Sequence, residues 1–184
     1  GILFLDEILE FKKNVLEALR QPLEDKKITI TRSSGTVTFP CNFMTILATN
    51  LCPCGNFSSN RPCTCTEYER KRYISKLSRP FLDRIDLFTF VNSLDFKDIE
   101  NHPKGEPSKN IKSRVEKARK IQKQRFKNEG IHCNSEMNSG LIRKYCNLDK
   151  RSLLLIKSIY IKYNLTTRAY SRILKVSRTI ADLS

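Results

Sequence analysis

Apolar residues follow two different periods along residues 1–92, and the pattern predicts strands and helices in the same stretch of chain. An unbroken apolar run at 2–5 is typical of a strand buried on both faces of a parallel sheet, and a second, mostly apolar run at 43–48 predicts another central strand. Between them, helical spacing predicts a helix over 10–20 that ends at Pro22. Further segments are predicted from local pattern and composition: a β-hairpin over 27–39, a loop over 51–65, a basic helix over 67–77 and a third short strand over 87–91.

Helical spacing takes over in the second half of the chain. A long helix is predicted from about residue 109, with mostly basic or amide residues outside its apolar stripe, and two more helices follow over 153–163 and 167–183. Between the halves, residues 93–108 combine charged side chains with two prolines and a glycine. We therefore predict an α/β fold over 1–92, a linker over 93–108 and a small all-α domain over 109–184.

Composition narrows the class of protein. The chain has 184 residues, 39% of them apolar and 29% charged, which fits one ordinary globular domain or two small ones. No run approaches the roughly 18 apolar residues of a membrane-spanning helix, so we expect no membrane association. No secretory leader opens the chain, and its seven cysteines then indicate a reducing, cytoplasmic compartment in which thiols stay free or bind metal.

Positive charge is concentrated in the second half. Residues 1–100 carry 14 basic and 13 acidic side chains (+1), whereas residues 101–184 carry 20 and 6 (+14). The field of such a basic segment favours binding to a polyanion, either a nucleic acid or nucleotide phosphates. Basic helix faces that are merely solvated would give the same counts, and the charge alone does not separate the two interpretations.

Polar residues directly follow both predicted central strands. Asp6 and Glu7 come after the first strand, and Thr49 and Asn50 come after the second. An acidic pair in this position is what a nucleoside-triphosphate hydrolase uses to hold Mg²⁺ and to polarise water, although such a pair is also common in an ordinary solvated turn. The carboxyl ends of parallel strands meet at one edge, where such sheets bind ligands. Polar residues at both strand ends therefore favour a ligand site more than either end would alone.

Long strings of residues, in one order along the chain, carry a family resemblance. They are Gly-Ile-Leu-Phe-Leu-Asp-Glu (1–7), Val-Leu-Glu-Ala-Leu-Arg-Gln-Pro-Leu-Glu-Asp (15–25), Ile-Thr-Ile-Thr-Arg-Ser-Ser-Gly-Thr-Val-Thr-Phe-Pro (28–40), Ala-Thr-Asn-Leu-Cys-Pro-Cys-Gly (48–55), Leu-Asp-Arg-Ile-Asp-Leu (82–87) and Thr-Arg-Ala-Tyr-Ser-Arg-Ile-Leu-Lys-Val-Ser-Arg-Thr-Ile-Ala-Asp-Leu (167–183). With these strings the chain resembles the magnesium chelatase-like AAA+ ATPases of the YifB/ComM type. The resemblance implies the later part of a P-loop AAA+ core, with a β-hairpin insertion, followed by a helical lid.

The resemblance also implies roles for individual residues in ATP hydrolysis. Asp6 and Glu7 would be the Walker B pair, with Asp6 at Mg²⁺, and Asn50 the sensor-1 amide that helps to place the attacking water. Arg84 would be the arginine finger that completes a neighbouring subunit's site in a ring, expected to be a hexamer. Arg168 would be sensor 2, reaching the γ-phosphate of ATP from the lid. Either guanidinium can bond two phosphoryl oxygens at once.

Each arginine has a structural alternative. Arg84 could be an ion-pair partner of Asp83 or Asp86, and Arg168 an exposed helical charge. The P-loop string Gly-x-x-x-x-Gly-Lys-Ser/Thr does not occur among the 184 residues. We therefore expect the P-loop to lie upstream of Gly1, and we expect this piece alone to bind ATP weakly or not at all and to be inactive.

Four cysteines form a second candidate site. Cys52 and Cys54 make one Cys-x-Cys pair, and Cys63 and Cys65 make another eight residues later. Four thiolates across one short loop suit tetrahedral Zn²⁺, and the loop has few apolar residues to order it otherwise. The single residue between paired cysteines departs from the usual two, so unligated thiols, a disulfide and an iron–sulfur cluster remain as alternatives.

The predicted hairpin carries Arg32 near its tip and Lys26 and Lys27 at its base. In helicase-like relatives a hairpin before sensor 1 projects into the ring channel, so the resemblance implies that Arg32 contacts nucleic acid, and the basic charge of the chain favours DNA. An ordinary surface hairpin is the alternative. Two functions therefore compete. One is the Walker B-to-lid portion of an AAA+ ATPase that acts on DNA, as a competence- or recombination-type helicase or translocase. The other is a basic, zinc-stabilised nucleic-acid-binding module without ATPase activity.

Overall fold

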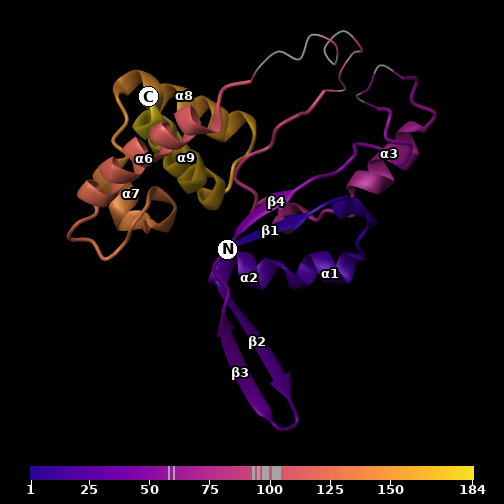
Figure 1. The fold of residues 1–184 in the computed structure, drawn as a ribbon, viewed down its shortest axis with the longest axis horizontal. Coiled ribbons are helices and arrows are strands. Elements are labelled where there is room, and N and C mark those ends of the chain that lie inside the picture. Colours follow the sequence, from indigo (N-terminus) through magenta and orange to yellow (C-terminus); the bar gives the residue numbers. More distant parts are fainter. Residues whose placement is uncertain (58, 60, 93, 95, 97–99, 101–104) are drawn as a thin grey trace. The chain divides into compact units, whose positions relative to one another are not determined.

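The computed structural model describes residues 1–57, 59, 61–92, 94, 96, 100 and 105–184. The chain divides into two compact units, 1–100 and 101–184, each with its own hydrophobic core (Figure 1). Much of the predicted linker, 93–108, lies outside the described residues. Among the described helices, none has both the length and the apolar character needed to cross a bilayer.

The first unit is mixed α/β. Its described elements are β1 (Ile2–Leu5), the 3₁₀ turn η1 (Ile8–Glu10), α1 (Lys13–Ala18), α2 (Arg20–Asp25), β2 (Lys27–Arg32), β3 (Gly35–Pro40), β4 (Met44–Leu47), α3 (Glu67–Ile74) and α4 (Arg79–Leu82).

Strands β1 and β4 form a parallel pair in register, with Ile2 opposite Met44 and Leu5 opposite Leu47. Both predicted strands are therefore confirmed, and both end at the same edge of a sheet in which two strands are described. The expectation of burial on both faces is wrong for these residues, because alternate side chains of each strand are exposed, for example Ile2 at 66% and Met44 at 56%. Only the opposite face packs on the core, through Leu5 and Leu47.

Strands β2 and β3 form the predicted antiparallel hairpin, joined by Ser33 and Ser34. Figure 1 shows it extending away from the rest of its unit, and all of its strand residues are exposed. Cross-strand pairs hold it together, because isoleucines face Phe39 and Val37 on one side and hydrogen-bonded threonines face one another on the other. The register is thus fixed by the pattern of its own side chains.

Two sequence predictions in this unit need correction. Pro22 does not end a helix but lies in the first turn of α2, where a proline costs no backbone hydrogen bond; the break falls earlier, between α1 and α2. The strand predicted over 87–91 is absent, and Leu87 and Val91 are 72% and 88% exposed. An apolar run forms a strand only where a neighbour accepts its hydrogen bonds, and no described strand lies beside this one.

The core of the first unit gathers around η1. Ile8 and Leu9 are 1% exposed and pack with Leu16, Tyr73 and Phe81. Tyr73 comes from α3, whose N-terminus is capped by Thr66 and Glu69 in a reciprocal capping box. The turn that follows Asp6 and Glu7 therefore contributes two buried side chains to this core, and α3 packs against it through Tyr73.

The regular elements described in the second unit are all helices. Its elements are α6 (Ser108–Arg125), the 3₁₀ turn η2 (Asn134–Glu136), α7 (Ser139–Tyr145), α8 (Lys150–Lys162) and α9 (Thr167–Leu183). Its core consists of Phe126, Met137, Ile142 and Leu174. The long helix and the two later helices predicted from the sequence are all present, whereas the short α7 and η2 were not predicted.

Candidate functional site

The ends of β1 and β4 bring three of the predicted site residues, Asp6, Glu7 and Asn50, to one edge of the sheet. The backbone N–H of Ala48 donates to the carbonyl of Leu5, and the N–H of Ile8 donates to the carbonyl of Ala48, both at 3.0 Å. The acidic pair and Asn50 therefore leave the sheet on neighbouring strands, tied together by these two bonds. Asp6, Glu7 and Asn50 are all exposed.

Glu7 has an unusual backbone conformation. Its φ of 48° and ψ of 46° lie in the left-handed region, which is uncommon for a residue with a side chain. The Glu7 N–H donates to Asp6 Oδ1 at 2.9 Å, and the Glu7 carbonyl accepts from the N–H of Glu10 at 2.8 Å. Strained residues of this kind cost roughly 1–3 kcal/mol and concentrate at functional sites.

Tyr73 of α3 reaches the turn after Glu7. Its hydroxyl donates to Glu10 Oε1 at 2.9 Å, and the side chain is 8% exposed. Burial raises the pKa of Tyr73 to about 12, assisted by the hydrogen bond to Glu10 and the charges of Glu10 and Glu7, while a hydrogen bond with Thr49 acts in the opposite direction. Tyr73 therefore stays neutral, and its pKa is affected by residues that follow both strands, Glu7 and Glu10 after β1 and Thr49 after β4.

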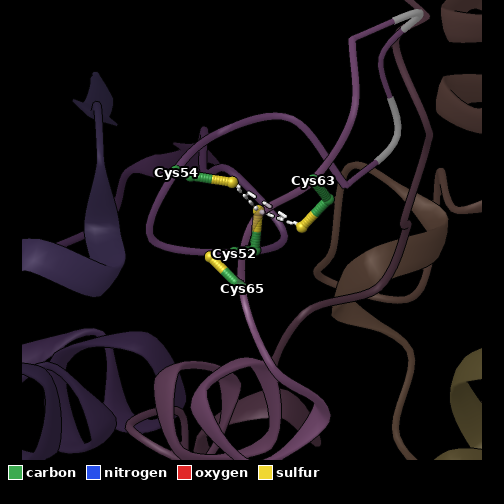
Figure 2. Close-up of side chains that lie close together, drawn as sticks. All are labelled: Cys52, Cys54, Cys63 and Cys65. Atoms are coloured by element: carbon green, nitrogen blue, oxygen red, sulfur yellow. Dashed lines mark hydrogen bonds between the residues drawn. The ribbon is translucent and has the colours of Figure 1, made fainter.

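The four predicted cysteines converge. Figure 2 shows their side chains pointing toward one another from the loop after β4, and all four Sγ atoms lie within 4.8 Å of one another. The sulfur atoms are 3.4 Å apart for Cys52 and Cys54, 3.6 Å for Cys54 and Cys63, and 3.8 Å for Cys63 and Cys52. A disulfide needs about 2.05 Å, and all seven cysteines are free thiols.

The electrostatics of this cysteine cluster are asymmetric. The backbone N–H groups of Asn56 and Thr64 donate to Cys54 and, with Cys65, lower the pKa of Cys54 to about 5. The backbone N–H of Cys54 lowers the pKa of Cys65, but hydrogen bonding to the Cys54 thiolate, burial and the charge of Cys54 outweigh it and raise that pKa to about 12. One thiolate is thus favoured, and a second is opposed by like charge.

The geometry of the cysteine cluster fits a zinc ion. Four ligands at the usual Zn–S distance of about 2.3 Å lie about 3.8 Å apart in a tetrahedron, close to the separations above. A dication at the centre would also remove the repulsion between thiolates. Gly55 lies in the tight turn that follows Cys52 and Cys54, where its N–H donates to the Cys52 carbonyl at 3.1 Å. Its φ of +77° favours glycine.

Arg84 follows α4 and is held against α2. Its guanidinium forms an ion pair with Glu24 and donates to the carbonyl of Pro80, and its side chain is only 10% exposed. Its Nε has no hydrogen-bond partner in the described part of the chain. The observed acidic partner thus comes from a helix 60 residues earlier, which the sequence pattern did not indicate.

A pocket of about 360 Å³ surrounds this ion pair. Its lining contains the carboxylates of Glu17, Glu24 and Asp25, the guanidinium groups of Arg20 and Arg84, and Gln21. The acidic residues outnumber the basic ones, so the pocket does not suit a polyphosphate. It also contains none of Asp6, Glu7 and Asn50, and it is distinct from the edge where those residues lie.

The remaining predicted residues lie on exposed elements. Arg168 is in the first turn of α9 and is exposed, in the second unit, and it has interactions of its own. Arg32 is the last residue of β2, opposite Gly35 at the hairpin turn, and is exposed. The roles of both arginines, like those of Asp6, Glu7, Asn50 and Arg84, stay predictions.

Comparison with known proteins identifies the family. The description "Magnesium chelatase, subunit ChlI" matches residues 1–99, and "Magnesium chelatase, subunit ChlI C-terminal" matches residues 105–184. The chain belongs to the magnesium chelatase subunit ChlI family. This is a family of AAA+ ATPases, and membership in it implies ATP and Mg²⁺ as ligands.

Curated relatives are similar in sequence to this ChlI-family chain over its whole length. It is 40% identical to the competence protein ComM of Haemophilus influenzae and 38% identical to the uncharacterized protein YifB of Salmonella typhimurium, each over 184 residues, and 37% identical to the uncharacterized protein YifB of Escherichia coli over 185 residues. Each comparison covers 100% of this chain and 35% of the relative. The chain therefore spans about a third of the length of these relatives.

Proposed function

We propose that this chain is the Walker B-to-lid portion of an ATP-hydrolysing AAA+ protein that works as a ring, expected to be a hexamer, on DNA. Asp6 would hold Mg²⁺, Glu7 would act as the base on the attacking water and Asn50 would orient that water. Arg84 would act across the subunit interface, and Arg168 would contact the γ-phosphate from the helical lid.

One observation carries the ATPase part of this proposal. Two parallel strands in register end side by side, and an acidic pair follows one while an amide follows the other. Carboxylates suit Mg²⁺ and general-base chemistry, and an amide can orient water without a charge of its own. The left-handed backbone at Glu7 supports a functional role, because ordinary turns rarely place a glutamate there.

The DNA part of the proposal rests on charge and exposure. Helix α6 carries eight basic side chains and a single acidic one within 18 residues, and most of its surface is exposed. Its basic residues are Lys109, Lys112, Arg114, Lys117, Arg119, Lys120, Lys123 and Arg125. The exposed hairpin adds Arg32 at its turn. Phosphate contacts from such side chains supply sequence-independent affinity.

We also propose that Cys52, Cys54, Cys63 and Cys65 hold a structural zinc ion. The observation is their convergence to sulfur separations that a tetrahedral metal requires. A closed set of four protein ligands leaves no position for substrate, so the ion would order the loop and take no part in hydrolysis.

The second candidate is a basic, zinc-stabilised nucleic-acid-binding module without ATPase activity. The +14 charge of residues 101–184 favours it as much as it favours the first candidate. The two differ in whether the strand-end residues perform chemistry. Under the second, DNA binding that weakens steeply with salt would be present while ATP hydrolysis would be absent from the full-length protein.

Glu7→Gln in the full-length protein tests the first candidate. The amide keeps the shape of the side chain and removes the base, so nucleotide binding and DNA binding should persist while the hydrolysis rate falls by about 10²-fold or more. Steady-state phosphate release and binding of a fluorescent ATP analogue measure the two effects. Hydrolysis within about twofold of the unmodified protein would remove Glu7 from the mechanism.

The matched control is Glu67→Gln, at an exposed glutamate in the first turn of α3 that pairs with Lys71. It removes the same charge from the same unit but from a position outside the strand edge. Its hydrolysis rate should stay unchanged.

A further inference from the structure

Helix α3 contacts the turn after Glu7 through two polar side chains. The Tyr73 hydroxyl donates to the Glu10 carboxylate at 2.9 Å, and Lys76, just beyond the helix, donates through Nζ to the carbonyl of Leu9 at 2.5 Å. The Lys76 ammonium also lies 5.2 Å from the centre of the Tyr73 ring. Two consecutive residues of η1 are thus held by side chains more than 60 positions later in the chain.

This turn needs such support. Glu7, which immediately precedes η1, has a left-handed backbone, and its carbonyl accepts the N–H of Glu10. A residue in this conformation persists only where surrounding contacts over-determine it. The contact between Tyr73 and Glu10 therefore bears on the same backbone segment that carries Glu7, although Tyr73 does not touch a reacting group.

The other end of α3 begins at the cysteine cluster. Thr66, the N-cap residue, directly follows Cys65, and Arg70 donates to the carbonyl of Cys65 at 2.5 Å. From the same loop, Gly55 lies against Asn50, since a Cβ at Gly55 would be 3.9 Å from three atoms of the Asn50 side chain. The loop and α3 thus border both strand ends.

We propose that Tyr73 is a positioning residue for ATP hydrolysis, which holds η1 so that Glu7 keeps its left-handed conformation, with α3 linking this turn to the cysteine cluster. The inference rests on the proposed ATPase function, and in it Tyr73 affects Glu7 indirectly, through its hydrogen bond to Glu10. It predicts a defect in the chemical step and not in nucleotide binding.

The test uses the full-length protein with Tyr73→Phe, which keeps the buried ring and removes the hydroxyl. We expect kcat to fall about three- to tenfold, the range set by one lost hydrogen bond, with the KM for ATP and the affinity for an ATP analogue within about twofold. Tyr68→Phe is the matched control, because Tyr68 lies on the same helix and is 71% exposed. It should leave both constants unchanged.

Variants of Glu10 separate positioning from general destabilisation. Glu10→Gln keeps an oxygen acceptor and should retain most of the rate, whereas Glu10→Ala should match Tyr73→Phe. Combining Glu10→Ala with Tyr73→Phe should lower kcat no further than either change alone. If Tyr73→Phe does not fold, Lys76→Met keeps the aliphatic stem and removes the bond to Leu9, and it should lower kcat in the same way.

The outcomes distinguish this inference from the proposed function. If Glu7→Gln abolishes hydrolysis while kcat of Tyr73→Phe stays within twofold of the unmodified protein, the positioning role is wrong and the ATPase assignment stands. Equal loss of nucleotide affinity and kcat would also overturn it, since that is the result of a merely structural role. If Glu7→Gln hydrolyses ATP at the unmodified rate, the proposed function itself fails.

Discussion

Asp182, near the C-terminal end of α9, is a carboxylate whose side chain has no exposed surface. It accepts hydrogen bonds from Arg125 at 2.7 Å, from Asn134 at 2.8 Å and from Arg178 at 3.1 Å, which join α6, η2 and α9. Burial alone would raise the pKa of Asp182, but the hydrogen bonds from Arg125 and Asn134 and the charge of Arg125 lower it to about 2. A buried pair of this kind is costly to break from one side.

The first prediction is an acid-dependent loss of stability in the second unit. A carboxylate with a lowered pKa stabilises the fold above its unfolded value of about 4, and this contribution disappears as the pH falls toward 2. The shift corresponds to about 2 kcal/mol. Urea unfolding at a series of pH values between 5 and 2, with amide hydrogen exchange in α9 as the local probe, measures this loss of stability. Asp182→Asn should be less stable at pH 7 and should lose this pH-dependent component; an unchanged acid profile would contradict the assignment.

Single residues show what could be predicted from the sequence. The meeting of Asp6, Glu7 and Asn50 at one edge followed from the strand pattern, because parallel strands align their carboxyl ends. Tyr73 and Glu10 were missed, because a hydrogen bond across 63 residues leaves no local pattern. The same holds for the partner of Arg84, where the nearby aspartates were the natural candidates and Glu24 is the residue observed.

At the scale of elements, polar groups and sulfur, and not an apolar core, hold the described residues of the loop after β4. Cys52 is fully buried, while Phe57 is 50% exposed and stacks with the Arg70 guanidinium at 4.7 Å. With so little apolar burial, the loop has little to offset the entropy of ordering it. A metal bound by four thiolates would supply that free energy, because metal-binding energy in such a loop is folding energy.

The second prediction is therefore close to one zinc ion per chain in protein prepared without chelators. Cys63→Ser combined with Cys65→Ser should abolish the metal and lower the free energy of unfolding by more than the ~1 kcal/mol of a typical substitution. Elemental analysis and urea unfolding measure the two effects. Cys41→Ser, at a partly buried cysteine outside the cluster, is the control and should keep its metal. Absence of stoichiometric metal with four freely reactive thiols would reduce the cluster to a cysteine-rich turn.

Elements were predicted well where periodicity was complete and poorly where a boundary depended on tertiary contacts. The helix over 167–183 and the hairpin appeared as expected, since each carries its full pattern within its own residues. The run over 87–91 has strand-like residues, but no described strand pairs with it. Pro22 shows the same limit, because a proline is tolerated in the first turn of a helix and excluded from its interior.

At the scale of the molecule, the chain consists of two compact units, 1–100 and 101–184. The first bears the strand edge, the cysteine cluster and Arg84, and the second bears Arg168 and most of the positive charge. In a ring, a site built from two subunits needs one guanidinium supplied by a neighbour, so the activity of each subunit would depend on its partner. In this chain Arg84 is engaged by Glu24, and this pair must open, or share the guanidinium, for Arg84 to reach a neighbour's phosphate.

The third prediction tests this action across subunits in the full-length protein. Arg84→Ala should abolish hydrolysis while sparing nucleotide binding, and mixing it with Glu7→Gln subunits should restore part of the rate. The restoration follows because some mixed interfaces pair an intact guanidinium from one subunit with an intact base from the other. Phosphate release across a series of mixing ratios measures it, with assembly confirmed by sedimentation at each ratio.

Glu24→Gln separates this role from a purely structural ion pair. It removes the charge that holds Arg84 and leaves the guanidinium in place. Because Arg84 is only 10% exposed, losing its partner can also lower stability, so the free energy of unfolding of the variant is measured beside its hydrolysis rate. If Arg84 acts across the interface, Glu24→Gln should retain hydrolysis or increase it, because the guanidinium is released. If Arg84 serves only to fasten α2, Glu24→Gln should impair hydrolysis as Arg84→Ala does, and no mixing ratio should recover activity. These two results together would leave Arg84 as a fastening residue of the first unit and would require the neighbour's positive charge to come from another residue.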